Sequence, residues 1–282
     1  FPARVNIPGE DLQGVIPGVD FLKDVKLFNC VDLSGQKVAV IGGGNTAIDS
    51  ARTAIRLGAQ EVTVLYRRTI DTMPAYEEEI EEALSEGVVI LELVSPVRFI
   101  AGPDGNLAMV ECIRREISDF DNQGRRNTKH VQGTNFLMDV DTVITAVSQY
   151  ADLPFINKGE IGVTDWGTFV IDPKTMMTTM PGVFAGGDIA RGPEDVIRAI
   201  ADGKHAAISI DKYLGGSGEL NKGRVIDIPV ITDDDDIVSH NRFPQEILPV
   251  EKRTDCFDEV VLGYHKLNAM AEAMRCLHCD RR

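Results

Sequence analysis

Apolar residues along the chain gather into short runs that glycine-rich and polar segments separate. The first clear run, Val38 to Ile41, leads into three consecutive glycines and then a helix-like stretch from Asn45. A second apolar run, Val62 to Tyr66, follows. Short apolar runs that alternate with helical patterns are typical of buried parallel strands. This order therefore predicts a strand, a tight turn, a helix and a second strand, the core of a Rossmann-like α/β unit.

Further segments extend this unit. Three of them predict strands: residues 88–94, 107–117 and 136–147. Two polar segments predict turns: residues 102–106 and 121–127. A helix is expected over 77–87, where Ile80, Ala83 and Leu84 share one face and Gly87 can end it. Its glutamates are expected to form a solvated face.

A second α/β unit is predicted from about residue 159 to 216. An apolar strand, Val183 to Ala185, is expected to present Gly187 and Asp188 at its carboxyl end, where ligands of α/β sheets bind. A carboxylate there can accept a hydrogen bond from a sugar or ribityl hydroxyl. The pair Asp195 and Val196 is expected to open a helix whose amides face an anionic group. The alternative is a tight turn without a ligand.

Composition narrows the function classes. The chain has 282 residues and a formal net charge of −15, which argues against binding to nucleic acid or to an anionic membrane. No apolar run approaches the ~20 residues of a membrane-spanning helix, so no membrane insertion is expected. The five cysteines are too few and too scattered for a secreted disulfide scaffold, which favours a cytoplasmic location. The amino terminus has neither a signal peptide nor an initiator methionine and predicts a piece of a longer protein.

The glycine turn is the first candidate binding site. Gly42 permits a sharp turn out of the strand, and Gly44 lets the backbone approach a pyrophosphate. The helix amides that follow can bind phosphates. The predicted phosphate-binding residues are Gly42, Gly43, Gly44, Asn45 and Thr46. The alternative is a turn that serves only the packing of strand against helix.

Two arginines occupy the position that specifies the ribose. An NAD site usually presents a carboxylate at the end of the second strand, whereas this chain has Arg67 and Arg68 there. A carboxylate would repel a 2′-phosphate, and arginine can bind it with two parallel hydrogen bonds. The sequence therefore predicts NADP(H) as the ligand. Ordinary surface charge is the alternative.

Four segments together carry a resemblance to a known family: residues 42–68, 73–79, 141–149 and 180–207. The chain resembles the flavoproteins with two dinucleotide-binding domains. The closest likeness is to the small (β) subunit of NADPH-dependent glutamate synthase and its electron-bifurcating and formate-dehydrogenase-associated relatives. In that family an NADPH domain is inserted between two halves of an FAD domain.

The resemblance implies roles for individual residues. Gly42 to Thr46 would bind the NADPH pyrophosphate, and Arg67 and Arg68 the 2′-phosphate. Asp188, after Gly187, would hold the FAD ribityl chain, and Asp195 with Val196 would face the flavin ring. Ala146 and Val147 begin the segment that stands where the family has a glycine-containing motif near the nicotinamide.

The same resemblance suggests a division of the chain. The expected parts are a lead-in from the FAD domain (1–30), an NADPH-binding Rossmann-like domain (31–150), the C-terminal part of an FAD-binding domain (151–216) and a tail with a C-x-x-C motif (217–282). The glycine fingerprint of the first FAD half is absent upstream of Lys37. The FAD site is therefore expected to be incomplete, and the missing FAD half or a redox partner subunit to complete it.

The C-x-x-C of the tail resembles the cysteine pairs associated with iron–sulfur clusters in these flavoproteins. Cys276 and Cys279 would be two of the four thiolates that a 4Fe–4S cluster requires. A free dithiol or redox pair is the alternative.

Two functions fit the sequence. The first is an NADPH-dependent flavoprotein oxidoreductase module that passes electrons from NADPH through FAD to an iron–sulfur centre or a partner enzyme. The second is a nucleotide-binding fragment that docks on the missing FAD half or on another subunit and is inactive alone. No acid–base residue is predicted, because the cofactors carry the hydride chemistry.

Overall fold

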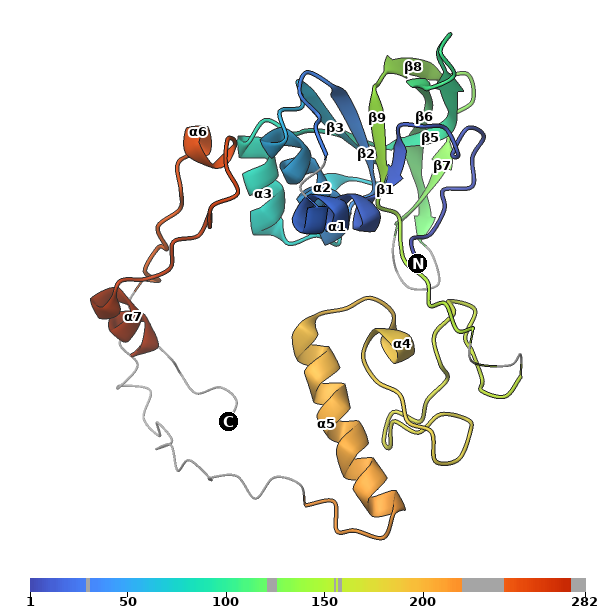
Figure 1. Ribbon diagram of the computed structural model, residues 1–282, viewed down its shortest axis with the longest axis vertical. Coiled ribbons are helices and arrows are strands. Elements are labelled where there is room, and N and C mark those ends of the chain that lie inside the picture. The colour runs from blue at the N-terminus through green and yellow to red at the C-terminus, as the bar shows by residue number, and fades with distance from the viewer. Residues whose placement is uncertain (29–30, 121–125, 155, 157–158, 220–240, 275–282) are drawn as a thin grey trace.

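The computed structural model describes residues 1–28, 31–120, 126–154, 156, 159–219 and 241–274. Its centre is a parallel sheet of five strands (Figure 1). Their order is β1 (Val15–Pro17), β9 (Thr142–Thr145), β2 (Lys37–Ile41), β3 (Glu61–Tyr66) and β4 (Val89–Glu92). The predicted strand, helix and strand of the Rossmann-like unit are confirmed by β2, α2 and β3.

Three helices cover one face of the sheet: α1 (Gly18–Phe28), α2 (Asn45–Arg56) and α3 (Glu77–Ser85). Side chains alternate across a strand, so β2 sends Val38 and Val40 toward these helices. Its other two apolar residues, Ala39 and Ile41, pack on the opposite face. The sheet is buried on both faces, which explains why β2 is apolar at nearly every position.

An antiparallel sheet covers that opposite face. It consists of β5 (Val94–Ala101), β6 (Leu107–Phe120), β7 (Arg126–His130) and β8 (Phe136–Asp139). Phe99 and Val110 of this sheet form one apolar cluster with Leu65 and Val143 of the parallel sheet. Figure 1 shows the resulting three layers, with helices, parallel sheet and antiparallel sheet in succession. Cys112 lies in this core, and burial, assisted by the charge of Glu111, raises the pKa of its thiol to about 12.

Several predicted boundaries change. Within the expected lead-in, residues 15–28 form β1 and α1, which belong to the parallel sheet and its helical layer. Strand β5 was not predicted, because Pro96 and Arg98 interrupt its apolar pattern where the register shifts. The predicted turn over 121–127 is partly wrong, since β7 begins at Arg126, while residues 121–125 lie outside the described part of the chain.

The second unit, around residues 159–219, is built mostly from loops and single β-bridges. The predicted strand from Val183 to Ala185 is wrong: Phe184 makes only an isolated bridge to Met177. Two helices follow, α4 (Asp188–Arg191) and α5 (Val196–Tyr213), and the second confirms the predicted helix start. Across the described residues, no helix is both long enough and apolar enough to cross a membrane.

A buried ion cluster joins the helical layer to the tail. The expectation that all glutamates of the 77–87 segment are solvated is wrong for Glu86, whose side chain is 0% exposed. Its carboxylate contacts Arg52 at 2.7 Å and Arg56 at 2.8 Å. Burial raises the pKa of Glu86, but the hydrogen bonds and charges of these two arginines outweigh it, and the pKa is lowered overall.

A third arginine reaches Glu86 from the tail. Arg253 ends α6 (Val250–Arg253), and its guanidinium lies 3.2 Å from the Glu86 carboxylate and donates a 2.6 Å hydrogen bond to Ser85. The Arg253 side chain is only 5% exposed. This contact fixes α6 beside α3, and the tail continues to α7 (Lys266–Ala273) (Figure 1).

Replacing Glu86 with glutamine should destabilise the protein. The change leaves three arginines around a neutral side chain, and breaking a buried ion pair in this way costs about 3–5 kcal/mol. Denaturant unfolding monitored by circular dichroism measures the loss. Glu81→Gln is the matched control, because Glu81 is exposed on the same helix and should change the free energy of unfolding by less than about 0.5 kcal/mol. Equal effects of the two substitutions would contradict the cluster's structural role.

Candidate functional site

The glycine turn joins β2 to α2 at the carboxyl edge of the parallel sheet. Gly42 has a φ of 147°, and a Cβ atom there would lie 2.3 Å from the carbonyl oxygen of Ala146. A Cβ on Gly43 would lie 2.3 Å from the ring of Tyr66. Gly44 differs, since the nearest atom to an added Cβ is 3.9 Å away on Pro74. Gly42 and Gly43 allow other parts of the chain to pack closely against the turn. Gly44 leaves open space beside the turn, which is called the glycine cradle below.

The amino terminus of α2 faces this cradle. Gly44 precedes the helix, no side chain caps it, and the first turn has no acidic residue. The first amides of a helix have no partner within it and attract anions. Asn45 accepts a hydrogen bond from the Tyr76 amide at 3.2 Å, which ties the helix start to the loop before α3. The arrangement has the donors and the space that a phosphate group requires.

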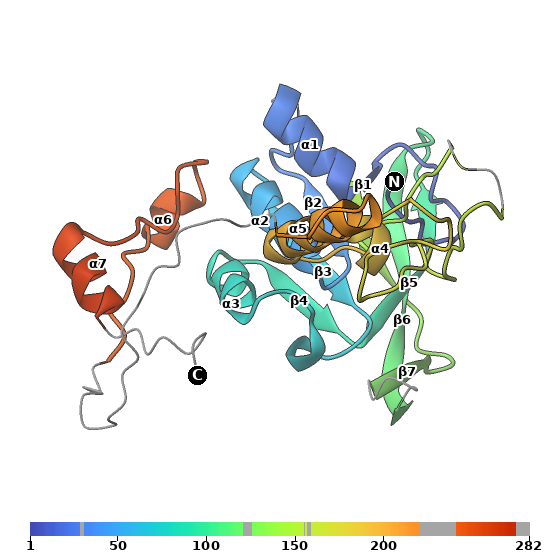
Figure 2. The ribbon, with the colours of Figure 1, turned by 90° about the horizontal axis from the view of Figure 1, so that it is seen from below.

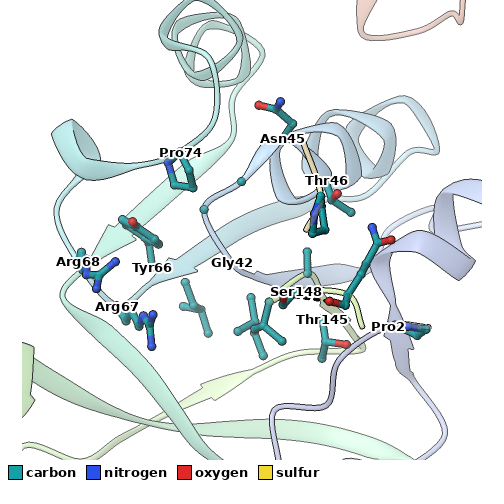
Figure 3. A pocket seen from close by; sticks show the side chains of 18 of the residues that line it. Pro2, Gly42, Asn45, Thr46, Tyr66, Arg67, Arg68, Pro74, Thr145 and Ser148 are labelled. Carbon is teal, nitrogen blue, oxygen red and sulfur yellow. Dashed lines mark hydrogen bonds between the residues drawn. The ribbon is translucent and has the colours of Figure 1, made fainter. Parts of the chain in front are cut away.

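Arg67 and Arg68 lie at the carboxyl end of the neighbouring strand. Figure 3 shows both beside Tyr66, on one side of the pocket, with Thr145 and Ser148 on the other. Arg67 is exposed and Arg68 is half-buried. The Tyr66 hydroxyl donates a 3.0 Å hydrogen bond to the Thr72 carbonyl, which holds the ring between the arginines and the glycine turn.

These features line a single pocket of about 1440 Å³. It brings together most of the residues predicted from the sequence: Gly42, Gly43, Gly44, Asn45, Thr46, Arg67, Arg68, Ala146, Val147, Asp188 and Asp195. Gly187 and Val196 are not among its lining residues. The sequence analysis missed other lining residues, among them Tyr66, Pro74 and Ser95. Pro74 belongs to the 73–79 segment, which was noted only for its resemblance and was given no role.

The opposite wall of the pocket comes from the second unit. Figures 1 and 2 show α4 and α5 next to the carboxyl edge of the parallel sheet, and Asp188 and Asp195 at the starts of these helices reach the pocket. Gly187 turns with a φ of 67°, which favours glycine. Asp195 caps α5 by accepting a 2.8 Å hydrogen bond from the Arg198 amide.

Asp202 of α5 holds this turn in place. Its carboxylate accepts hydrogen bonds from the Gly187 amide at 2.9 Å and from the Arg191 guanidinium at 2.6 and 2.7 Å. The bond from Arg191 and then that from Gly187 lower the pKa of Asp202 to about 2. Asp202 therefore stays ionised at neutral pH and positions the Gly187–Asp188 corner from behind, while Asp188 itself remains exposed.

The predicted cluster ligands Cys276 and Cys279 lie outside the described residues. Among the residues that are described, no group of three or more histidine, cysteine, aspartate or glutamate side chains could hold a metal ion. Cys256 is half-buried, and its thiol donates to the Lys252 carbonyl at 3.2 Å.

Several proteins with similar sequences are subunits of oxidoreductases that use NADP(+) or NADPH. The chain is 40% identical to the NADP(+)-dependent formate dehydrogenase subunit beta of Moorella thermoacetica over 99% of its own length and 41% of that protein. It is 34% identical to the NADPH-Fe(3+) oxidoreductase subunit beta of Geobacter sulfurreducens, over 98% and 46%. It is 36% identical to the glutamate synthase [NADPH] small chain of Azospirillum brasilense, over 78% and 48%. The chain thus spans less than half the length of these relatives, and the predicted likeness to glutamate synthase small chains is confirmed.

Solved structures show the same fold. FprA of Mycobacterium tuberculosis in complex with NADPH matches with a TM-score of 0.62 and 22% identity, over 76% of this chain and 61% of that one. Thioredoxin reductase of T. acidophilum matches with a TM-score of 0.58 and 20% identity, over 76% and 62%. The predicted α/β class is confirmed. The family model described as pyridine nucleotide-disulphide oxidoreductase matches residues 1–203, and the chain belongs to this family.

Proposed function

We propose that the chain is the NADPH-binding and partial FAD-binding module of an NADPH-dependent flavoprotein oxidoreductase. The observation that carries the proposal is a single pocket that joins an open glycine cradle to Arg67 and Arg68. When bound, NADPH supplies a hydride, and FAD accepts it and can release electrons one at a time. The chain's own residues bind and orient these groups.

The glycine cradle and the arginines fit the two phosphate-bearing parts of NADPH. The amides at the start of α2 would bind the pyrophosphate, with Gly44 leaving room for its close approach. Arg67 and Arg68, at the end of β3, would bind the 2′-phosphate. Ala146 and Val147 also line the pocket and would border the nicotinamide.

The second unit fits one part of FAD. The Gly187–Asp188 corner presents an exposed carboxylate for the ribityl hydroxyls, and Asp195 with Val196 would approach the flavin from the start of α5. The apolar residues there are unusually bare, with Val196 73% and Ile197 75% exposed. Such a surface favours a covering group. We propose that FAD covers this surface, together with the rest of a longer flavoprotein or a partner subunit. The proposed location of the protein is the cytoplasm.

The tail is the proposed exit for electrons. The relatives from Moorella and Geobacter match 98–99% of the chain, so their similarity includes most of residues 217–282. Cys276 and Cys279 remain candidate ligands of a 4Fe–4S cluster that would pass electrons to a partner enzyme. The names of these relatives, a formate dehydrogenase subunit and an Fe(3+) oxidoreductase subunit, suggest the class of redox partner.

The bare start of α5 also favours a second candidate function. If the exposed Val196 and Ile197 mark a half-built flavin site, the chain alone binds NADPH but transfers nothing until another polypeptide covers α5. This candidate is a docking module without activity of its own.

Flavin binding separates the two candidates. With added FAD, the active module is expected to retain flavin, seen by its visible absorbance, and to reduce a dye at the expense of NADPH. Asp188→Ala should lower the retained flavin, because it removes the proposed acceptor of the ribityl hydroxyls. Asp165→Ala, at another exposed position of the same unit, is the control. A chain that binds NADPH but stays colourless and inactive would favour the docking module.

Substitution of the two arginines tests the choice of nucleotide. Arg67→Ala and Arg68→Ala should each weaken NADPH binding by about 1.5–3 kcal/mol, since each removes hydrogen bonds to a charged phosphate. NADH binding should hardly change. Arg98→Ala is the control, because Arg98 is paired with Glu111 on the antiparallel sheet. Calorimetric titrations that show equal losses for NADPH and NADH would contradict the 2′-phosphate role.

Gly44→Ala tests the cradle without disturbing the fold. A Cβ at Gly44 meets no atom closer than 3.9 Å, and its φ of −91° suits alanine, so the thermal unfolding midpoint should be unchanged. NADPH binding should fall at least about tenfold, a loss of about 1.4 kcal/mol, because the methyl group occupies the pyrophosphate space. Gly203→Ala, in open space on α5, is the control for the binding measurement. Unchanged NADPH affinity in Gly44→Ala would show that phosphate does not enter the cradle.

A further inference from the structure

Arg115 lies behind the two arginines of the pocket and belongs to a different layer of the protein. It is on β6 of the antiparallel sheet and is half-buried. Its guanidinium donates hydrogen bonds to the Thr128 hydroxyl at 2.8 Å and to the Ser95 hydroxyl at 3.2 Å. A third bond goes to the Thr128 carbonyl. Ser95 lines the pocket, so Arg115 is one side chain removed from the pocket wall.

Hydrogen bonds connect Arg115 to the backbone of both pocket arginines. The Thr128 hydroxyl, which accepts from Arg115, donates a 3.0 Å hydrogen bond to the Arg67 carbonyl. The Leu93 amide donates to the Arg68 carbonyl at 3.1 Å, and the Arg115 amide donates to the Leu93 carbonyl at 2.7 Å. The residue thus supports the segment that carries Arg67 and Arg68 through two separate routes.

Arg115 differs from two other basic residues of the antiparallel sheet, which form ion pairs with glutamates. On the same sheet, Arg98 pairs with Glu111 and Lys129 pairs with Glu116. In the described part of the chain, Arg115 contacts hydroxyl and carbonyl groups only. Burial lowers its pKa, and the charges of Arg67 and Arg68 lower it further, so the three cations repel one another.

A neutral side chain would avoid this repulsion. Glutamine could donate hydrogen bonds to Ser95 and Thr128 without placing a charge near two others. Half-burying a cation without a carboxylate costs free energy, and an anion bound nearby offsets that cost. Among the described residues Arg115 has no carboxylate partner, and an anion bound in the pocket would offset its charge.

We infer that Arg115 is a third cation of the 2′-phosphate site, a positioning residue that orients Arg67 and strengthens the pocket's preference for NADPH over NADH. The inference rests on the proposed NADPH function and deepens it. Arg115 acts through its charge and through Thr128, behind the wall that Ser95 forms. Its ligand is the dianionic phosphate on the adenosine ribose.

The test compares Arg115→Gln with Arg115→Lys in the full chain, with NADPH and NADH as probes in calorimetric titrations. Arg115→Gln should weaken NADPH binding about three- to tenfold, because it removes one unit charge near the phosphate, and should leave NADH binding unchanged. Arg115→Lys keeps the charge and should recover most of the lost NADPH affinity. Higher salt should narrow the difference between wild type and Arg115→Gln.

Arg114→Gln is the matched control. Arg114 is the preceding residue on β6 and is exposed, and its guanidinium lies 5.4 Å from the centroid of the Phe136 ring. The substitution therefore removes one positive charge, as Arg115→Gln does, but from a different place. It should leave the ratio of NADPH to NADH affinity unchanged.

Several results would overturn the inference. Equal losses of NADPH and NADH affinity in Arg115→Gln would mean that Arg115 only supports the fold, and unchanged affinities would mean that it supports neither nucleotide. If Arg115→Gln does not fold, a large loss of NADPH preference in Arg115→Lys would exclude the charge as the cause. If the wild-type chain binds NADH as tightly as NADPH, the proposed function is overturned as well. If the wild-type chain prefers NADPH and Arg115→Gln keeps the same preference, this inference alone is overturned.

Discussion

The contact between Gly42 and the Ala146 carbonyl is the constraint on which the pocket depends. The Ala146 amide donates to the Ile41 carbonyl at 2.7 Å, so β9 remains paired with β2 up to the last residue before the glycines. Its carbonyl then occupies the space that any side chain at position 42 would need. This close contact fixes the distance between the turn into α2 and the turn that follows β9. Both turns line the pocket.

The layers on the two faces of the parallel sheet contribute differently to this pocket. The helical layer supplies the start of α2 and, through the loop before α3, the support for Asn45. The antiparallel layer carries no glycine turn, yet Ser95 reaches the pocket wall and Thr128 fixes the Arg67 backbone. The antiparallel layer therefore has a role beyond burying Leu65 and Val143.

The sequence predicted the parts of this structure that depend on neighbours in the chain. The apolar runs of β2 and β3, the glycine turn and the start of α5 at Asp195 follow from local periodicity and capping. The contacts missed from the sequence join residues far apart. Glu81 and Glu86 belong to one acidic segment, and the sequence does not show that Glu81 is exposed while Glu86 is buried. Arg253, which contacts Glu86, lies 168 residues along the chain from its hydrogen-bond partner Ser85. Tyr66 and Ser95 gave no local signal, since each is an ordinary strand residue until the sheet edge brings it to the pocket.

The attachment of Arg253 to Glu86 has a kinetic consequence. It makes α6 a fixed point on the helical layer, and the chain that continues from Arg253 is a covalent tether whose length the sequence sets. A group carried by Cys276 and Cys279 would then meet the rest of this polypeptide at an effective concentration that tether length and stiffness determine. Dilution of the protein would not slow such an encounter. Shortening the tether, or breaking the contact of Arg253 with Glu86, would change the frequency of this encounter without changing any residue of the pocket.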